Sequence, residues 1–216
     1  MISGILWDND GVLVDTERIY FEVNRDYLRL HDAELSEEDF FNWFLLDNRG
    51  AWHLLSEKGI TAEEIAALRK RRDEIYTARL LTESGLAVPG VERVLDTLSK
   101  RVDMGVVTSA NREHYDAIHA PLTLNRHFKF VLTAETYMNS KPSPEPYLLG
   151  LKRLGLKGEE CLVIEDSPRG LRAATDAGIR CIILRNRMTM HHEFTGAHRV
   201  VDSMDDLLIE IEALLR

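Results

Sequence analysis

Side chains that can do chemistry stand directly after the apolar segments of this sequence. Those that follow segments 2–7, 104–107 and 161–164 are, in order, Asp8 and Asp10, Thr108 and Ser109, and Glu165 and Asp166. Lys141 lies in a proline-containing loop that precedes a helical segment. In an open α/β sheet, ligands bind beyond the carboxyl ends of the strands. We therefore expect these side chains to gather at one rim of a sheet.

The acidic residues predict a metal site. Asp8 and Asp10 are two residues apart on an extended segment, so their side chains should point one way and Asn9 the opposite way. Carboxylates held close together, with a second acidic pair opposite, repel unless a cation lies between them. Oxygen ligands with incomplete coordination by the protein suit Mg²⁺, which keeps waters and binds substrate phosphate. Thr108 and Lys141 are then placed to hold a phosphoryl group.

Three neighbouring residues keep more than one interpretation. Ser109 can donate to a phosphate, or it can serve only a turn or the cap of the next helix. Glu165 can bind metal or hydrogen-bond to nearby backbone. Ser167, followed by Pro168, fits the N-cap of a helix better than a nucleophile, because no histidine partner is evident.

The same residues resemble the motifs of a known family. Residues 8–17 (Asp-Asn-Asp-Gly-Val-Leu-Val-Asp-Thr-Glu) are similar to the first motif of the haloacid dehalogenase-like (HAD) superfamily. Thr108, Lys141 in a Lys-Pro-x-Pro context, and Glu-Asp-Ser-x-x-Gly at 165–170 resemble the second, third and fourth motifs in order. Segments 89–91 and 173–178 resemble the branch that contains β-phosphoglucomutase and phosphoglycolate phosphatase, so the likeness extends over nearly the whole chain.

The resemblance implies a Mg²⁺-dependent phosphatase that acts on a small phosphorylated metabolite, with a sugar phosphate as the leading candidate. It implies that Asp8 is the nucleophile, which attacks phosphorus and forms an aspartyl-phosphate intermediate. Asp10 would protonate the leaving oxygen and then take a proton from the hydrolytic water.

The resemblance also implies a set of binding residues. The Asp8 side chain, the backbone carbonyl of Asp10 and Asp166 would bind Mg²⁺, with Glu165 as a weaker candidate ligand. Thr108 and Lys141 would bind the substrate phosphate, with Ser109 as a further candidate from its position beside Thr108; electrostatics does much of the positioning in phosphoryl transfer.

The elements that must position these residues alternate between strand and helix after residue 88. Short apolar runs at 104–107, 130–133, 161–164 and 181–184 are separated by helical segments, and a last helix is expected at 207–215. This alternation predicts βαβ units and a parallel sheet. We expect an α/β, Rossmann-like core with helices on both faces, formed by residues 1–15 and 85–216.

Residues 16–84 predict an inserted all-α domain. Ser36 and Thr61 begin helices, the second with capping-box spacing. In the helix after Thr61, Ile65, Leu68 and Ile75 fit one apolar stripe that should face the protein core. Residues 69–72 are expected mostly on the side that faces solvent. The insertion resembles the α-helical cap of the family, which closes over the site and selects the leaving group.

A lid of this kind needs two hinges, which we place near residues 14–16 and 85–89. The segment 47–52 is the part of the insertion most suited to face the substrate. There, Arg49 would bind a second anionic group and Asn48 would read a hydroxyl.

Other histidines and cysteines have simpler interpretations. His114 and His119 are expected on the surface of a helix, and the pair 191–192 in a solvated loop. Cys161 and Cys181 lie in apolar strands, where they are expected to be buried and unreactive.

Four alternative functions share parts of this pattern. A β-phosphoglucomutase-like phosphomutase has a histidine early in the first cap helix and a later Lys-Gly pair, where this chain has Tyr20 and leucines at 45–46. A haloacid dehalogenase lacks the acid at Asp10. A phosphonate hydrolase needs a cap lysine in an apolar setting, which Lys58 and Lys70 lack. A non-enzymatic binding module would have no need of every charged motif residue.

Composition argues against several other classes of protein. The chain has 216 residues and a formal net charge of −9, which argues against broad contact with nucleic acid. No apolar run approaches the length of about 20 residues that a bilayer requires, and residues 1–7 do not resemble a secretory signal. Two cysteines are too few for a disulfide framework. We expect a cytoplasmic protein without membrane contact, and a monomer by default.

Overall fold

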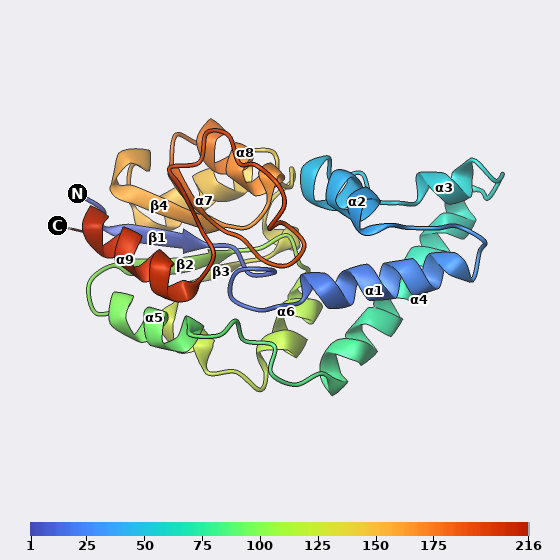
Figure 1. Cartoon of the computed structure of the whole chain (residues 1–216), viewed down its shortest axis with the longest axis horizontal. Coiled ribbons are helices and arrows are strands. Elements are labelled where there is room, and N and C mark those ends of the chain that lie inside the picture. The colour runs from blue at the N-terminus through green and yellow to red at the C-terminus, as the bar shows by residue number, and fades with distance from the viewer. Residues whose placement is uncertain (216) are drawn as a thin grey trace.

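Six parallel strands form one sheet in the computed structural model, which describes residues 1–215 (Figure 1). The strand order is β3-β2-β1-β4-β5-β6, and every neighbouring pair is parallel. The strands are β1 (Gly4–Trp7), β2 (Asp103–Val107), β3 (Val131–Leu132), β4 (Cys161–Glu165), β5 (Arg180–Leu184) and β6 (Arg199–Val201). The short edge strand β6 was not expected from the sequence, because only one of its three residues is buried.

Helices cover both faces of the sheet, as the sequence predicts. Successive residues of β1 point to opposite faces, so Ile5 packs in one apolar cluster and Leu6 in the other. The first cluster is covered by α5 (Val91–Leu98), α6 (Arg112–His119) and α9 (Met204–Leu214). The second is covered by α7 (Glu145–Leu154) and α8 (Pro168–Asp176), on the opposite side of the sheet in Figure 1. Three short 3₁₀ turns complete this part: η2 (Leu124–His127), η3 (Ala134–Thr136) and η4 (Gly158–Glu160).

The start of α8 follows from its sequence. Ser167 has an extended backbone, and its hydroxyl accepts a hydrogen bond from the backbone N–H of Gly170 at 3.1 Å. Pro168 occupies the first helical position, where its missing N–H leaves no bond unmade. The prediction of Ser167 as an N-cap is confirmed.

The segment between β1 and α5 is helical and forms nearly all of a third apolar cluster, to which the sheet part adds Met188. Its elements are α1 (Glu17–Arg29), α2 (Glu37–Phe40), the π-helical turn η1 (Phe41–Leu46), α3 (His53–Ser56) and α4 (Ala62–Thr82). Ser36 and Thr61 are the N-caps of α2 and α4, and each is part of a complete capping box. Both expected helix starts are therefore confirmed.

The buried face of α4 differs from the predicted one. Ile75 is 38% exposed, whereas Arg72 and Tyr76 are buried at 6% and 4%. The Arg72 guanidinium lies over the rings of Tyr20 and Trp52, at 4.8 and 5.5 Å from their centroids. Because α4 packs against both α1 and α6, its buried stripe follows these neighbours rather than its most apolar residues. The aromatic rings cover the stem and face of Arg72, which makes its burial possible.

The two chain segments that join the helical part to the sheet lie side by side. Val14 and Ala87 form an isolated antiparallel bridge. The Asp15 N–H donates to the carbonyl of Leu86 at 2.7 Å, and the Val88 N–H to the carbonyl of Leu13 at 3.0 Å. Within residues 1–215, no helix combines the length and the apolar character needed to span a membrane.

Candidate active site

Three buried carboxylates meet where two central strands end. Asp8 follows β1, Glu165 is the last residue of β4, and Asp166 follows it. These strands are neighbours, and the chain leaves them toward opposite edges of the sheet, which opens a crevice at their carboxyl ends. Ligand oxygens of the three residues all lie within 4.8 Å of one another. We call these residues the acidic cluster.

A buried ammonium group holds the acidic cluster together. Lys141 is 1% exposed, and its Nζ donates to Asp8 Oδ1 at 2.8 Å, to Glu165 Oε1 at 2.6 Å and to the carbonyl of Val107 at 3.0 Å. All three N–H donors are therefore used. Burial by itself lowers the pKa of Lys141, but the charges of Asp8 and Glu165 raise it further than burial lowers it. The side chain is a permanent cation in this site.

Glu165 is fully engaged by the protein. Its Oε1 accepts from Lys141 and from the Tyr147 hydroxyl at 2.6 and 2.7 Å. Its Oε2 accepts from the N–H of Asp166 and from the N–H and hydroxyl of Ser167, at 3.1, 3.3 and 3.0 Å. A carboxylate offers about four lone pairs, and five donors already point at this one. Glu165 therefore orients Lys141 and the start of the following loop.

Glycines allow this close approach. A Cβ added at Gly170 would overlap the carboxyl group of Glu165, and one added at Gly11 would overlap Asp166 Oδ2. Gly11 also has a φ of +79°, which disfavours other residues. Both positions belong to the sequence motifs, and here their reason is steric.

Asp8 and Asp166 keep free oxygens suited to a divalent cation. Lys141 binds Asp8 Oδ1, and the Asn186 amide donates to Asp166 Oδ2 at 2.7 Å; the second oxygen of each carboxyl accepts no hydrogen bond from the described chain. Burial, followed by the charge of Glu165, raises the pKa of Asp8 to about 7. Burial, followed by the charge of Glu17, raises the pKa of Asp166 well above its ordinary value. Free hard oxygens under mutual repulsion are the donor set that Mg²⁺ prefers.

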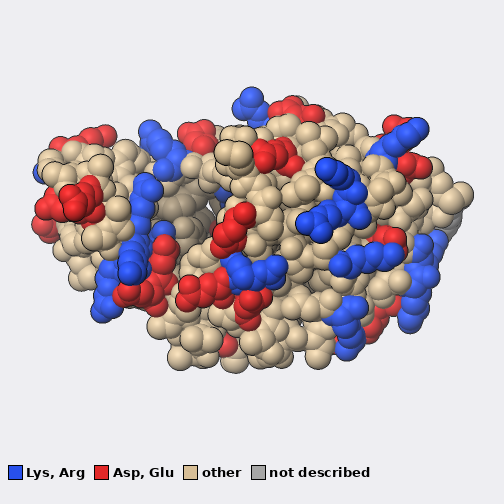
Figure 2. All heavy atoms as spheres, turned by 180° about the vertical axis from the view of Figure 1, so that it is seen from behind, with Lys and Arg blue, Asp and Glu red and all other residues tan. Residues whose placement is uncertain are grey.

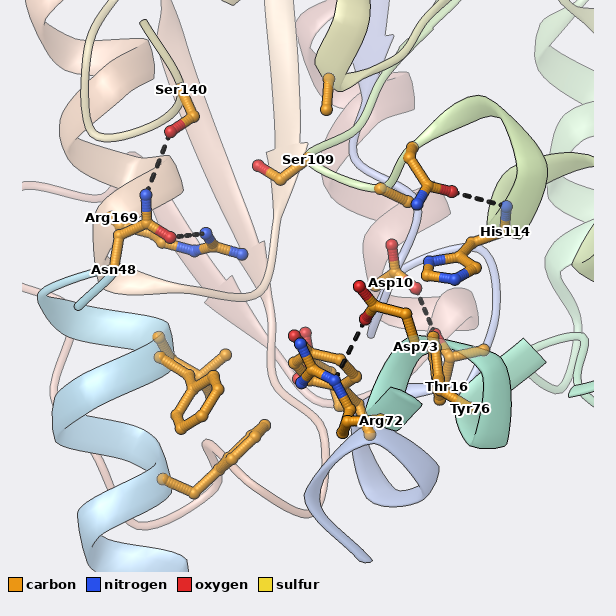
Figure 3. A pocket seen from close by; sticks show the side chains of 18 residues that line it. Asp10, Thr16, Asn48, Arg72, Asp73, Tyr76, Ser109, His114, Ser140 and Arg169 are labelled. Atoms are coloured by element: carbon orange, nitrogen blue, oxygen red, sulfur yellow. Dashed lines mark hydrogen bonds and ion pairs between the residues drawn. The ribbon is translucent and has the colours of Figure 1, made fainter. Parts of the chain in front are cut away.

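Asp10 lies apart from the acidic cluster. Its Oδ1 accepts from the Thr16 hydroxyl at 2.5 Å, and its Oδ2 from Asn9 Nδ2 and the Thr108 hydroxyl at 3.2 and 3.3 Å. Thr108 in turn accepts from the backbone N–H of Ala110 at 3.0 Å. Asp10 and Thr16 both line a cavity, in which their hydrogen bond is visible (Figure 3).

The cavity has a volume of about 400 Å³ and lies between the sheet rim and the inserted helices. Seen from behind, the surface between the two parts of the molecule is hollowed, and both basic and acidic side chains surround the hollow (Figure 2). Ser109 contributes a hydroxyl to the cavity wall that is buried and has no hydrogen-bond partner within residues 1–215. Asn111 instead caps α6, because its Oδ1 accepts from the N–H of His114 at 2.7 Å.

The two residues predicted to face the substrate from the insertion have different positions. Asn48 lines the cavity; its Nδ2 donates to Ser140 Oγ at 3.1 Å, and its Oδ1 accepts from Arg169 at 2.8 Å (Figure 3). It thereby joins the helical part to the loop before α7 and to the first turn of α8. Arg49 is not among the residues that line the cavity, and its guanidinium lies 5.3 Å from the ring of Trp43.

Sequence reasoning missed four charged residues of the cavity wall: Glu17, Arg72, Asp73 and Arg169. Glu17 is 7% exposed, and burial, with the charge of Asp10 second, raises its pKa to about 8. Glu17 is the last residue of the first motif, and Arg169 lies inside the fourth. Membership of these motifs was the sequence signal that could have identified both residues. Arg72 gave no signal, because its place in α4 looked solvent-facing.

The expected surface positions of two histidines are wrong. His114 is 8% exposed and His119 is 2% exposed. Helix α6 lies against α4 as well as against the sheet core, and Tyr76 of α4 packs edge-on against His114 at 5.1 Å. In the loop at 191–192, His191 is exposed, but His192 is half-buried and stacks on Phe41.

Comparison with known proteins places this geometry in context. A family model described as haloacid dehalogenase-like hydrolase matches residues 5–184. A phosphorylated carbohydrates phosphatase from Thermotoga maritima is 32% identical over 183 residues, 84% of each protein. Hexitol phosphatase A from Escherichia coli is 32% identical over 181 residues, 83% of this chain and 82% of that protein. A mutant of CbbY from Rhodobacter sphaeroides, solved with xylulose-(1,5)bisphosphate, has a TM-score of 0.78 at 25% identity and covers 94% of this chain and 95% of that one.

Proposed function

Because the chain belongs to the haloacid dehalogenase-like hydrolase family and is a phosphoric monoester hydrolase, we propose that it is a Mg²⁺-dependent phosphatase of small sugar phosphates. The observation that carries the proposal is the acidic cluster. The cluster binds a buried ammonium, Lys141, and keeps one free carboxylate oxygen on each of Asp8 and Asp166. Asp10, two residues after Asp8, and Arg169, three residues after Asp166, line a cavity of about 400 Å³, which is large enough for a small metabolite.

Asp8 is the proposed nucleophile. Lys141 fixes its Oδ1, which leaves Oδ2 to attack phosphorus. The new bond joins this oxygen to phosphorus as the ester P–O bond breaks, and Asp10 gives a proton to the leaving alcohol. Asp10 then takes a proton from a water that attacks the aspartyl phosphate, so that inorganic phosphate leaves and Asp8 is restored.

Asp8, Asp166 and the backbone carbonyl of Asp10 would hold Mg²⁺. When bound, the ion would offset the negative charge that develops on the attacking and leaving oxygens. Glu165 has no lone pair left for this task, so we assign it to the positioning of Lys141 and of the Asp166 loop.

Thr108, Ser109 and Lys141 would bind the transferring phosphoryl group. The unpartnered Ser109 hydroxyl is the one of the three that has a free donor. Lys141 contributes its charge, because its N–H groups are already used. Thr108 would orient both the phosphoryl group and Asp10, to which it already donates.

The charges of the cavity wall favour a leaving group that is neutral and rich in hydroxyls. Arg72 forms an ion pair with Asp73 at 3.1 Å, seen in Figure 3. The second cation, Arg169, is shared with Asn48 and lies in the field of Glu17. The wall contains two arginines and three acidic residues, Asp10, Glu17 and Asp73, so it has no excess of basic side chains to attract a second phosphate. A sugar monophosphate fits better than a bisphosphate.

We propose residues 16–84 as the cap that closes on this substrate, with hinges at residues 14–16 and 85–89. The backbone pairing between residues 13–15 and 86–88 supports these hinges, because a rotation of one segment must move the other with it. The bridge from Asn48 to Ser140 and Arg169 would hold the closed form.

Release of inorganic phosphate from a panel of sugar monophosphates, hexitol phosphates, phosphoglycolate and nucleoside monophosphates tests the proposal. We expect turnover that EDTA abolishes and excess Mg²⁺ restores. Asp8→Asn should lower kcat by at least about 10³-fold, whereas Asp15→Asn, an exposed acid of the same motif, should match wild type. Equal rates for Asp8→Asn and wild type would refute the mechanism. Positional isomerisation without net phosphate release would identify a phosphomutase instead.

A further inference from the structure

A buried chain of hydrogen bonds connects Asp10 to a histidine that the proposed mechanism does not use. Asn9 Nδ2 donates to Asp10 Oδ2 at 3.2 Å, and Asn9 Oδ1 lies 2.7 Å from Nε2 of His119 in α6. Asn9 is 0% exposed and His119 is 2% exposed, so water does not replace either contact. The residues are 110 positions apart in the sequence, and only the packing of α6 brings them together.

The direction of each hydrogen bond in the chain is fixed by chemistry. The Asp10 oxygens accept from Thr16, Thr108 and Asn9, so Asn9 turns its NH₂ group toward Asp10 and its carbonyl toward His119. His119 must then donate from Nε2, which leaves Nδ1 without a proton. Nδ1 is buried and has no partner among the described residues, as expected for the neutral ring. Burial lowers the pKa of His119 to about 4, which keeps the ring neutral near pH 7.

The His119 ring and the backbone of Asn9 are both held in place. The ring of Tyr115 stacks on His119, with centroids 4.1 Å apart and an interplanar angle of 17°. The backbone carbonyl of Asn9 accepts from the N–H of Leu13 at 2.8 Å, which anchors the loop after β1. The side-chain amide of Asn9 is held only by its contacts with Asp10 and His119. Without a donor at His119, the side-chain carbonyl of Asn9 would lack a hydrogen bond, and the side-chain amide could rotate away from Asp10.

We propose that His119, acting through Asn9, is a positioning residue that holds the Asp10 carboxyl for transfer of its proton to the leaving alcohol. The inference rests on the role of Asp10 proposed above and deepens it. Asp10 has two further donors, Thr16 and Thr108, which come from the helical part and from the end of β2. Asn9 is the donor adjacent to Asp10 in the chain, and it ties the acid to the rigid sheet core.

The test separates positioning of the acid from support of the fold by means of the leaving group. An alkyl alcohol leaves only when protonated, whereas p-nitrophenol leaves readily as an anion. We expect His119→Phe, which keeps an aromatic ring on Tyr115, to lower kcat/KM about tenfold for the best alkyl phosphate of the panel. The value for p-nitrophenyl phosphate should change less than twofold. His119→Gln, whose amide can donate from a similar place, should restore most of the alkyl phosphate activity.

Matched variants complete the design. Tyr115 lies on the same helix as His119, and Tyr115→Phe removes only the hydroxyl that donates to Asn125 of η2 at 2.5 Å. This variant should have equally small effects on both substrates. Asn9→Leu should reproduce His119→Phe, and the double variant should be no worse than either one. Equal losses on both substrates, or an Asn9→Leu variant with wild-type selectivity, would overturn the inference.

Two further measurements keep the proposals distinguishable. Asp10→Asn should lose alkyl phosphate turnover; if it does so while His119→Phe keeps wild-type selectivity, only the role of His119 fails. If Asp10→Asn is fully active, the role of Asp10 fails and that of His119 with it. Should His119→Phe not fold, ¹⁵N NMR of the wild-type ring decides. A proton on Nδ1 instead of Nε2 would refute the chain of hydrogen bonds.

Discussion

Replacing Glu17 by glutamine should stabilise the metal-free protein in alkaline solution but not in acidic solution. Glu17 is 7% exposed, and burial, with the nearby charge of Asp10 second, raises its pKa from 4.5 to about 8. The folded protein therefore holds the Glu17 proton more tightly than the unfolded chain does. This contribution to stability is complete below about pH 4.5 and is lost as the pH rises through about 8. Glutamine cannot ionise, so it does not incur the loss.

The size of the effect follows from the two pKa values. A pKa that rises from 4.5 to about 8 corresponds to a total of about 5 kcal/mol, since each unit is worth about 1.4 kcal/mol. Most of the change falls between pH 5 and pH 8. We therefore expect the free energy of unfolding of Glu17→Gln, relative to wild type, to increase by about 3.5 kcal/mol over this interval.

Urea unfolding in EDTA, followed by tryptophan fluorescence at pH 5, 6, 7 and 8, measures the difference. Glu83→Gln is the control, because the hydrogen bond from Arg79 and other contacts lower the pKa of that carboxyl. Glu83 is ionised in both states above pH 5, so the stability difference for its variant should be constant over the series. A Glu17→Gln difference that is equally flat would show that Glu17 ionises normally and would refute the argument from burial.

Three further perturbations test other parts of the site. Lys141→Met leaves buried carboxylates without their cation and should lower the free energy of unfolding by about 3–5 kcal/mol in urea titrations, against less than about 1 kcal/mol for the exposed pair lost in Lys129→Met. Asn48→Ala removes two hydrogen bonds across the cavity and should raise KM about tenfold with little change in kcat, whereas Arg49→Ala should leave both constants within about twofold in the same steady-state assay. Mg²⁺ at about 100 times its Kd should stabilise wild type by about 2.7 kcal/mol in calorimetry, and Asp166→Asn should remove most of this gain.

The parts of the site that could be predicted are those fixed by local sequence. Strand ends are marked by the change from apolar to acidic residues, so Asp8 and Asp166 could be placed at one rim once the parallel sheet was recognised. Helix starts are marked by caps, as at Ser36 and Thr61. Lys141 could be assigned to the site because its loop precedes a helix that must return to the sheet.

The parts that could not be predicted depend on contacts distant in the sequence. Periodicity assigned Arg72 to solvent because arginine is rarely buried, yet two aromatic rings from other elements cover it. His119 looked like a surface residue because its partner Asn9 lies 110 positions away. The edge strand β6 has too few buried residues to give a pattern. Each of these features is decided by what packs against the residue, which composition and spacing do not encode.

The acidic cluster explains why stability and catalysis oppose each other in this site. Asp8, Glu165 and Asp166 carry three potential negative charges within 4.8 Å, and Lys141 supplies one positive charge. Glu165 uses most of that compensation, because its pKa is lowered below the ordinary value while those of Asp8 and Asp166 are raised. The repulsion thus falls on the two acids that keep a free oxygen. A carboxylate that is poorly compensated is a stronger base and nucleophile than one in a complete ion pair, so the same charge arrangement that weakens the fold would prepare Asp8 for the attack proposed above.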